Sequence, residues 1–273
     1  MALVTVTNPE TGKVWEYYMD DRLKKNLDKR VIPALKIKDE DYVFVIDGGE
    51  REGKSSLAIQ IARYVDPSLN LDRIIFNPTN FKEVILKAKK GQCIIFDEAF
   101  RGLASRGALT EMNKVLVGLM MEMGQKNLCV IIVLPTFFLL EKYVAIFRSR
   151  GLIHVYKSKK GQKGYWVYFN KRKRKILYLK GKKEFDYRVV KSKFRGRFYG
   201  KLPIEEDGYR LKKKLALREF YKRGVSGNDR KQRDQLIRIL FDELRYPQRK
   251  FIEYLKGKGF VFSRDSLSKI IKE

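Results

Sequence analysis

The chain has 273 residues, 44% of them hydrophobic, and carries 60 basic against 32 acidic side chains for a net charge of +28. This length suffices for one sizeable core with a smaller appendage. Two cysteines and one histidine exclude a disulfide framework and a zinc cluster, so we expect a protein of the reducing cytoplasm, the host cytoplasm if a virus encodes it. We expect no membrane span, because the longest apolar run has thirteen residues and a span needs about 20.

Strands and helices alternate along the first 157 residues. Residues 3–19 alternate apolar and polar positions around Asn8-Pro9-Glu10-Thr11-Gly12, which indicates a hairpin, and a loosely helical brace follows at 20–36. Apolar strands are predicted at 42–46, 73–76, 93–96, 128–134 and 152–156. Helical patterns separate them at 54–64, 81–90, 110–126 and 138–147. Wholly apolar strands between helices predict an α/β core with a mainly parallel sheet covered by helices.

The second half of the chain is much more basic than the first. Residues 1–150 hold 23 Lys and Arg against 19 Asp and Glu, whereas 151–273 hold 37 against 13. Short strand patterns at 165–169 and 176–179 lie among lysine clusters, and Pro203 to Gly208 indicates a linker. Helices are predicted at 210–223, 230–244, 248–255 and 264–271, the last capped by Ser263. The predicted domains are a hairpin and brace (1–39), a core (40–157), a basic β-rich extension (158–203), and a linker with a small helical domain (204–273).

A glycine-rich loop joins the strand at 42–46 to the helix at 54–64. Its sequence, Gly48-Gly49-Glu50-Arg51-Glu52-Gly53-Lys54-Ser55, fits the phosphate-binding pattern of spaced glycines followed by Lys and Ser. Glycines let the backbone amides turn inward, and the helix N-terminus adds partial positive charge. We therefore expect this loop and Ser56 to bind ATP, with Lys54 on the β and γ phosphates and Ser55 on Mg²⁺. Glu50 and Glu52 should then point away from the phosphates.

An acidic pair follows the strand at 93–96. Asp97 and Glu98 stand at its carboxyl end, which is the edge of such sheets where ligands bind. We expect Asp97 to hold Mg²⁺ through water and Glu98 to polarise the attacking water. Together with Lys54 these groups suffice for hydrolysis, because that reaction depends mostly on positioning and charge neutralisation.

The two motifs resemble those of the additional-strand, catalytic-glutamate division of P-loop ATPases, in which a strand intervenes between them, as 73–76 does here. The resemblance covers about residues 40–157, and the layout is most similar to the FtsK–HerA group and to phage assembly and packaging ATPases. It implies ATP, Mg²⁺ and hydrolysis. Those families often carry Gln at the end of the next strand; here Thr136 stands there, a candidate γ-phosphate sensor. Phage assembly proteins usually also have a membrane span.

Four arginines are candidates for a finger that reaches the ATP of a neighbouring subunit. Arginine suits this role because its charge is permanent and its donors are bidentate. Arg101 and Arg106 follow the acidic pair, and Arg148 and Arg150 precede the strand at 152–156. A finger among them implies a homo-oligomer with shared ATP sites; each one is otherwise a surface or structural charge.

The basic half predicts a polyanion partner, with DNA favoured over an anionic membrane surface. Aromatic residues interleaved with the basic ones at 157–199 either stack on bases or pack in the core. The first candidate phosphate contacts are Lys171, Arg172, Lys173, Arg174 and Lys175. The last three helices resemble a helix-turn-helix that would present Arg264, Ser266 and Lys269 to double-stranded DNA. A generic three-helix cap or an oligomerisation unit is the alternative.

Three functions fit these patterns. The first is an oligomeric, DNA-stimulated motor for translocation or packaging, such as a virus or mobile element encodes. The second is an ATP-switched DNA-binding protein, such as a replication initiator, loader or regulator, with slow hydrolysis. The third is a small-molecule kinase, for which Ile46-Asp47-Gly48 is a faint signal. The acidic pair favours water activation over the kinase, and the first function accounts best for the ATP motifs and the basic half together.

Replacement of Glu98 by Gln keeps the shape of the side chain and removes its charge. We expect Glu98→Gln to bind Mg-ATP like the wild type but to hydrolyse it about 100-fold more slowly or worse, because a general base contributes ~10²–10⁴-fold. Single-turnover hydrolysis and nucleotide binding, measured side by side, test this, with Glu10→Gln in the predicted hairpin as the matched control. A wild-type rate in Glu98→Gln would remove Glu98 from the catalytic site.

Overall fold

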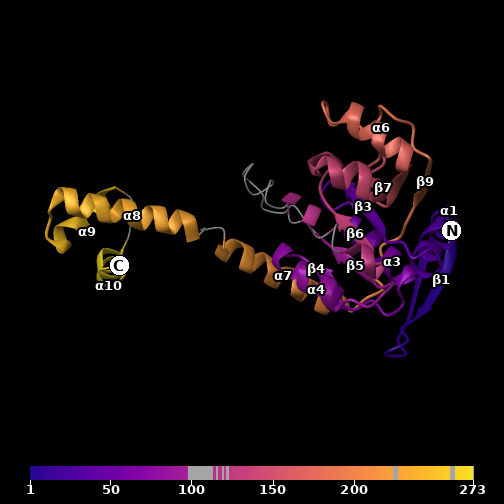
Figure 1. Ribbon diagram of the computed structural model, residues 1–273, viewed down its shortest axis with the longest axis horizontal. Coiled ribbons are helices and arrows are strands. Elements are labelled where there is room, and N and C mark those ends of the chain that lie inside the picture. The colour runs from indigo at the N-terminus through magenta and orange to yellow at the C-terminus, as the bar shows by residue number, and fades with distance from the viewer. Residues whose placement is uncertain are drawn as a thin grey trace. The chain divides into compact units, whose positions relative to one another are not determined.

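A computed structural model describes residues 1–97, 113–114, 116–118, 120, 123–223, 227–258 and 262–272 (Figure 1). Of the predicted helix at 110–126, the described residues 113–114, 116–118 and 120 are helical, and Met123–Lys126 is a 3₁₀ turn. The chain forms two compact units, Met1–Lys213 and Lys214–Glu273. The glycine-rich loop and Asp97 belong to the first unit, so this unit holds the described part of the candidate site.

Seven strands form the central sheet, in the spatial order β4-β5-β6-β3-β7-β8-β9 (Figure 1). The strands are β3 Tyr42–Gly48, β4 Ile74–Ile75, β5 Cys93–Phe96, β6 Cys129–Val133, β7 Ser149–Tyr156, β8 Tyr165–Asn170 and β9 Phe194–Arg197. Strands β3, β4, β5, β6 and β7 pair in parallel, and β8 pairs antiparallel with both β7 and β9. The predicted α/β fold with a mainly parallel sheet is confirmed.

Strand β6 lies between β3 and β5, the two strands that the sequence motifs follow, and it pairs with both. By contrast β4, which separates the two motifs in the sequence, lies at the edge of the sheet. This order places the carboxyl ends of β3, β6 and β5 next to one another. The segments that follow these three strands therefore meet at one edge.

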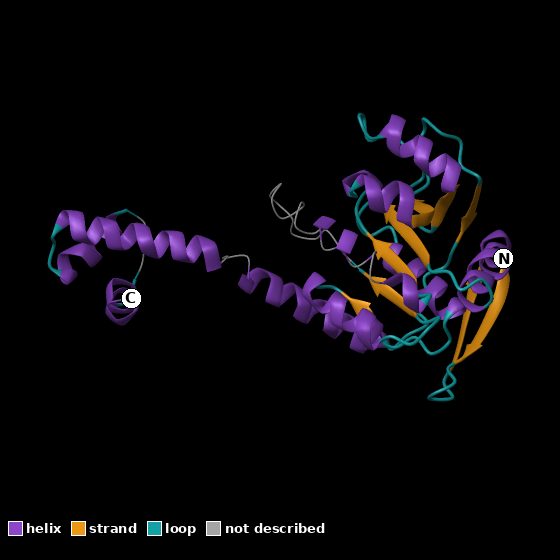
Figure 2. Cartoon of the chain, viewed as in Figure 1, coloured by secondary structure: helices purple, strands orange, loops and turns teal. Residues whose placement is uncertain are grey.

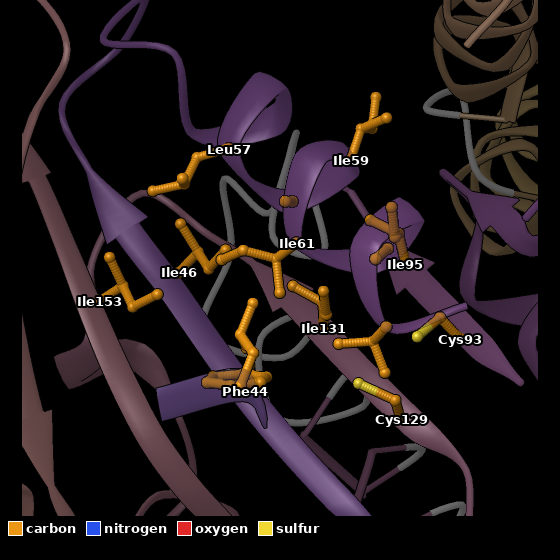
Figure 3. Packing of buried hydrophobic residues seen from close by; sticks show 14 of the residues in the cluster. Phe44, Ile46, Leu57, Ile59, Ile61, Cys93, Ile95, Cys129, Ile131 and Ile153 are labelled. Carbon is orange, nitrogen blue, oxygen red and sulfur yellow. The ribbon is translucent and has the colours of Figure 1, made fainter. Parts of the chain in front are cut away.

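Helix α3, Lys54–Val65, covers one face of the sheet. Its Leu57 and Ile61 belong to the same buried cluster as Phe44 and Ile46 of β3 (Figure 3). The N-terminal segment packs into this cluster too, through β1 Ala2–Thr7, β2 Val14–Met19, α1 Asp21–Asn26, the π-helix Leu27–Val31 and α2 Ile32–Lys36. The hairpin and helical brace predicted for residues 3–36 are thus confirmed.

Helices also cover the other face of the sheet, as the cartoon shows (Figure 2). Val43 and Val45 of β3 point to this side, because successive residues of a strand face opposite ways. They cluster with buried residues of α4 Pro78–Lys87, the 3₁₀ turn Phe137–Leu139, the π-helix Tyr143–Arg148 and α6 Lys171–Gly181. Burial on both faces accounts for the wholly apolar strand sequences.

Two local predictions are wrong. Residues 176–179 are not a strand, because they lie inside α6, where Asn170 caps the first turn by accepting from the Lys173 N–H at 3.1 Å. The run of Lys and Arg that precedes them favours a helix. Four consecutive apolar residues are too few to distinguish the spacing of a helix from that of a strand. The predicted helix at 138–147 is instead the 3₁₀ turn and the π-helix named above.

The second unit contains three helices among its described residues. They are α8 Gly227–Leu244, α9 Gln248–Gly257 and α10 Arg264–Lys272, as predicted within a few residues. The preceding helix, α7 Glu206–Arg223, begins in the first unit and starts within the predicted linker. A small core holds the three helices together, made of Ile237, Phe251, Leu255, Leu267 and Ile270. The Ser263 hydroxyl caps α10 by accepting from the Ser266 N–H at 3.2 Å.

None of the helices among the described residues combines the length and the apolar character that crossing a membrane requires.

Gly151 of β7 offers a test of this packing. A Cβ atom at this position would lie 2.9 Å from Tyr168 Cε2 and 3.2 Å from Phe44 Cε1. We expect Gly151→Ala to lower the free energy of unfolding by about 1–3 kcal/mol, because overpacking forces neighbours to shift. Gly200→Ala is the matched control, since a Cβ there meets no atom within 4 Å. Urea denaturation measures both variants; equal stability would contradict the packing described for β3, β7 and β8.

Candidate nucleotide site

The glycine-rich loop lies between the end of β3 and the start of α3, and two of its glycines are required by geometry. Gly48 has φ +141°, and a Cβ there would lie 2.1 Å from the Val155 carbonyl oxygen. Gly53 has φ +95°, and its Cβ would lie 2.8 Å from the Phe198 ring. Such positive φ angles strain residues with side chains. The turn is therefore possible only with glycine at both positions.

The Lys54 ammonium lies over the start of this loop. It donates to the carbonyl oxygens of Gly48 at 2.8 Å and Gly49 at 2.5 Å. Burial lowers the pKa of Lys54, against the opposing effect of nearby carboxylates, of which Glu52 is the largest. The cation therefore stands where the pattern predicts, at the base of the phosphate loop.

Ser55 and Asp97 bring the two sequence motifs into contact. The Ser55 hydroxyl donates to Asp97 Oδ1 at 3.0 Å. Asp97 directly follows β5 and is buried, with 1% of its surface exposed. A hydroxyl and a carboxylate are hard oxygen donors of the kind that Mg²⁺ prefers. The residues predicted to hold the metal are thus adjacent, and their donor set fits it.

Tyr209 and Lys213 of α7 complete the surroundings of Asp97. The Tyr209 hydroxyl donates to Asp97 Oδ2 at 2.7 Å, and the Lys213 ammonium lies 4.0 Å from the same oxygen. The ring of Tyr209 packs on Phe76, with centroids 5.7 Å apart. Sequence reasoning missed both residues because they lie more than a hundred positions after Asp97 in a segment interpreted as a linker and a charged helix. No spacing rule connects them.

The two glutamates of the loop were predicted to point away from the phosphates, and Glu52 does not. Glu52 turns back over the loop, where its carboxylate accepts from the Gly49 N–H at 2.7 Å. A phosphate that takes this amide must displace the carboxylate. Glu50 and Arg51 are exposed. Among the described residues no ion pair links Arg51 to Glu50 or Glu52.

A second buried carboxylate, Asp47, lies immediately before the loop. It accepts from the Phe137 N–H at 2.7 Å and from the Tyr187 hydroxyl, and its other oxygen lies 3.0 Å from His154 Nδ1. The His154 ring stacks on Tyr187 with centroids 3.8 Å apart. Burial, followed by the charge of Asp47, raises the pKa of Tyr187, so its hydroxyl stays protonated and donates. The sequence did not reveal this cluster.

Thr136, the candidate sensor, is connected to this cluster. Its hydroxyl lies 2.9 Å from the Tyr187 hydroxyl. The neighbouring Pro135 carbonyl accepts from the Gly48 N–H at 3.3 Å. The end of β6 therefore touches the start of the loop. A sensor role for Thr136 stays a prediction.

The arginine-finger candidates divide between two regions. Arg148 pairs with Asp41, and Arg150 with Glu40 at 2.6 Å, at the edge of the sheet where the parallel strands begin. This is the edge opposite the loop, so neither arginine reaches the site of its own chain. Arg101 and Arg106 lie outside the described residues. The predicted base Glu98 also lies outside them.

The five basic residues at the start of α6 lie on different faces of the helix, so some are exposed and others are half-buried or buried. Lys171, Arg172 and Lys175 are exposed. Lys173 is half-buried and donates to the Lys191 carbonyl at 2.7 Å. Arg174 is fully buried and donates to the carbonyls of Ala145 at 2.8 Å and Ile146 at 3.1 Å. The prediction that Arg174 contacts DNA is therefore wrong, because its guanidinium holds the π-helix against α6.

The second unit exposes the predicted recognition residues. Arg264, Ser266 and Lys269 are exposed, while Leu267 and Ile270 are buried. This is the division of faces that the sequence predicts. A helix-turn-helix role for α10 stays a prediction.

The sheet order and the loop together define a mixed α/β protein with a P-loop at the carboxyl edge of its sheet. No family model and no curated protein matches the sequence. The N-terminal domain of zonular occludens toxin from Neisseria meningitidis is similar over 63% of this chain and 98% of its own, at 12% identity and a TM-score of 0.35. The VirB11 ATPase of the Brucella suis type IV secretion system, in complex with sulphate, is similar over 65% and 76%, at 12% identity and a TM-score of 0.33. These values are too low to carry a function across.

Removal of the Tyr209 hydroxyl tests whether α7 orients Asp97. We expect Tyr209→Phe to raise the Mg²⁺ concentration needed for half-maximal binding of a fluorescent ATP analogue by about tenfold or more, because partners of metal ligands tune metal affinity by ~10–100-fold. Binding without Mg²⁺ should not change. Tyr199→Phe, which removes the hydroxyl of an exposed tyrosine, is the control. An unchanged Mg²⁺ requirement in Tyr209→Phe would mean that its hydroxyl only packs.

Proposed function

We propose that this protein binds and hydrolyses Mg-ATP at the loop 48–55. The observation that carries the proposal is the 3.0 Å contact between Ser55 and Asp97, because it joins a phosphate loop to a buried carboxylate at the carboxyl edge of a parallel sheet. Chance matches to the loop pattern lack such a partner. In this proposal Lys54 binds the β and γ phosphates, and Glu98 activates the attacking water.

The metal-binding part of the proposal uses only side chains already in contact. Ser55 and Asp97 would hold Mg²⁺, Asp97 through a bound water. The ion, when bound, supplies charge neutralisation on the phosphates. Tyr209 keeps the Asp97 carboxylate in one orientation by its hydrogen bond to Oδ2. In this proposal the loop amides and Lys54 orient the phosphate chain, and Thr136 contacts its end.

The finer proposal is a DNA-associated motor with shared ATP sites, of the kind that translocates or packages DNA. The uneven charge supports it, since residues 151–273 hold 37 Lys and Arg against 13 Asp and Glu. Because Arg148 and Arg150 are ion-paired at the far edge, Arg101 and Arg106 are the preferred fingers for a neighbour's site. The second unit, with its exposed Arg264, Ser266 and Lys269, is a further candidate for DNA contact.

One observation favours the second candidate, an ATP-switched DNA-binding protein with slow hydrolysis. The Glu52 carboxylate holds a loop amide that a phosphate would need. Exchange of this carboxylate for phosphate is a change of state at the loop that nucleotide binding alone can drive, without turnover. A switch requires only this exchange, whereas a motor requires rapid and repeated hydrolysis.

Steady-state hydrolysis with and without DNA tests the proposal. We expect Ser55→Ala to lose hydrolysis by about two orders of magnitude, because Mg²⁺ supplies several kcal/mol of transition-state stabilisation. Ser192→Ala, in the loop before β9, is the control for the substitution. Wild type and both variants are assayed with single- and double-stranded DNA at low and moderate salt.

The outcomes separate the candidates. Strong stimulation of the wild type by one form of DNA supports the motor and identifies its track. Slow hydrolysis that ignores DNA, together with tight DNA binding, supports the switch. Full activity in Ser55→Ala would reject the assigned site.

A further inference from the structure

A large basic groove lies at the edge of the sheet opposite the loop. Its volume is about 1110 Å³. Its floor includes Tyr42 and Ser149, the first residues of β3 and β7, and Asn170, the last residue of the antiparallel β8. Because β3 runs for seven residues from this groove to the loop, the two lie roughly 20 Å apart. We call this feature the amino-edge groove.

Positive charge dominates the amino-edge groove. Six exposed cations line it without an ion pair to any described residue: Lys29, Arg30, Lys38, Lys171, Arg172 and Lys175. The two acidic residues of the lining, Glu40 and Asp41, are already paired with Arg150 and Arg148. The groove therefore presents a strong positive potential that its own carboxylates do not neutralise. Concave surfaces lined by one sign of charge concentrate ligands of the opposite sign.

The cations come from segments far apart in the sequence. Lys29 and Arg30 stand on the π-helix 27–31, and Lys38 follows α2, whereas the other three stand on the exposed side of α6. The same helix turns Lys173 and Arg174 away from the groove to bind backbone carbonyls. The charge is thus gathered on one concavity by the fold and does not reflect a uniformly basic surface.

An aromatic ring stands in the lining among these charges. Phe147, at the end of the π-helix Tyr143–Arg148, is 65% exposed and lines the amino-edge groove. An exposed ring beside unpaired cations matches the two needs of a nucleic-acid strand, which are phosphate neutralisation and a surface on which a base can stack. A duplex keeps its bases stacked inside and is stiff, so it offers this ring no partner within a recess.

We infer that the amino-edge groove binds a single strand of nucleic acid, with its cations on the phosphates and Phe147 against a base. The volume exceeds the ~300–1,000 Å³ usual for small-molecule pockets, which favours a polymer segment over a small anion. A flat membrane surface cannot reach the floor of a recess. The inference rests on the proposed association with nucleic acid and is independent of hydrolysis.

Charge reversal on α6 tests the groove against the overall charge. The variant Arg172→Glu/Lys175→Glu changes two groove cations, and Lys159→Glu/Lys160→Glu makes the same charge change on exposed residues of the β7–β8 turn. Fluorescence anisotropy with a labelled single strand of about 12 nucleotides measures affinity across salt concentrations. We expect the groove variant to bind about tenfold more weakly or worse, and its salt slope to fall by about 1.4, the equivalent of two phosphates. The control should stay within about twofold of the wild type, because salt screens distant charges.

Phe147→Leu separates the single strand from other partners. We expect this variant to weaken single-strand binding by about fivefold or more and to leave binding of a duplex of equal length unchanged, since only unpaired bases stack on a ring. Equal losses in the two charge variants, or an unaffected groove variant, would overturn the groove assignment. Preference for duplex with no effect of Phe147→Leu would overturn the single-strand assignment. If the groove variant lost binding to anionic vesicles but still bound nucleic acid like the wild type, the groove would bind a membrane and the inference would be rejected.

Binding of a fluorescent ATP analogue, measured in the same proteins, keeps this test apart from the proposed hydrolysis. We expect the wild type and the two groove variants to bind it equally, because the groove is at the other end of β3. Failure of the wild type to bind nucleotide would reject the ATP site and leave the groove result standing. Failure of the wild type to bind any nucleic acid would reject the groove and the proposed association together.

Discussion

Two carboxylates are buried directly beneath the glycine-rich loop, and much of the surrounding structure serves to supply them with hydrogen-bond donors. Asp47 and Asp97 are 0% and 1% exposed. A buried carboxylate without partners is very costly. Here each of the four carboxylate oxygens has a partner: Asp97 is held by Ser55 and Tyr209, and Asp47 by a backbone amide, Tyr187 and an imidazole. The two acids beneath the loop are therefore buried without being left unpaired.

This requirement explains why the part of the basic half that ends at Lys213 joins the core. The hydroxyls of Tyr187 and Tyr209 come from segments after the parallel part of the sheet, and both segments belong to the first compact unit. Between them the chain runs along α3, where Gln60 donates to the carbonyls of Tyr199 at 2.6 Å and Lys201 at 2.9 Å. Removing residues 187–209 would expose the helix that follows the loop and leave both aspartates short of donors.

The parts of the fold that could be predicted were those with a local signal. The spacing of apolar residues predicted the sheet and most helices. The loop and the acidic pair could be found because each is a motif of consecutive residues. Tyr187 and Tyr209 could not be predicted, because each reaches its aspartate across more than a hundred residues through a tertiary contact. The strand expected at 176–179 failed for the opposite reason: its local apolar pattern was real, but the cap at Asn170 and the basic run made it one turn of a helix. Arg174 shows the same limit, since composition cannot tell which residue of a basic run faces inward.

The contact between Glu52 and Gly49 has a consequence for where binding energy comes from. Loop amides that converge on one point favour an anion, and the Glu52 carboxylate already supplies one at 2.7 Å. A bound phosphate therefore replaces one anion by another at this amide, and the exchange adds little net stabilisation there. The affinity of the proposed site for nucleotide, and its preference for a terminal phosphate, must then come from groups where no carboxylate already takes the place of the phosphate. Lys54 is the foremost of these, because its ammonium gives up only neutral carbonyl partners when it turns to a phosphate. In the proposed site, discrimination between nucleotides would then rest with Lys54, the metal ligands and Thr136.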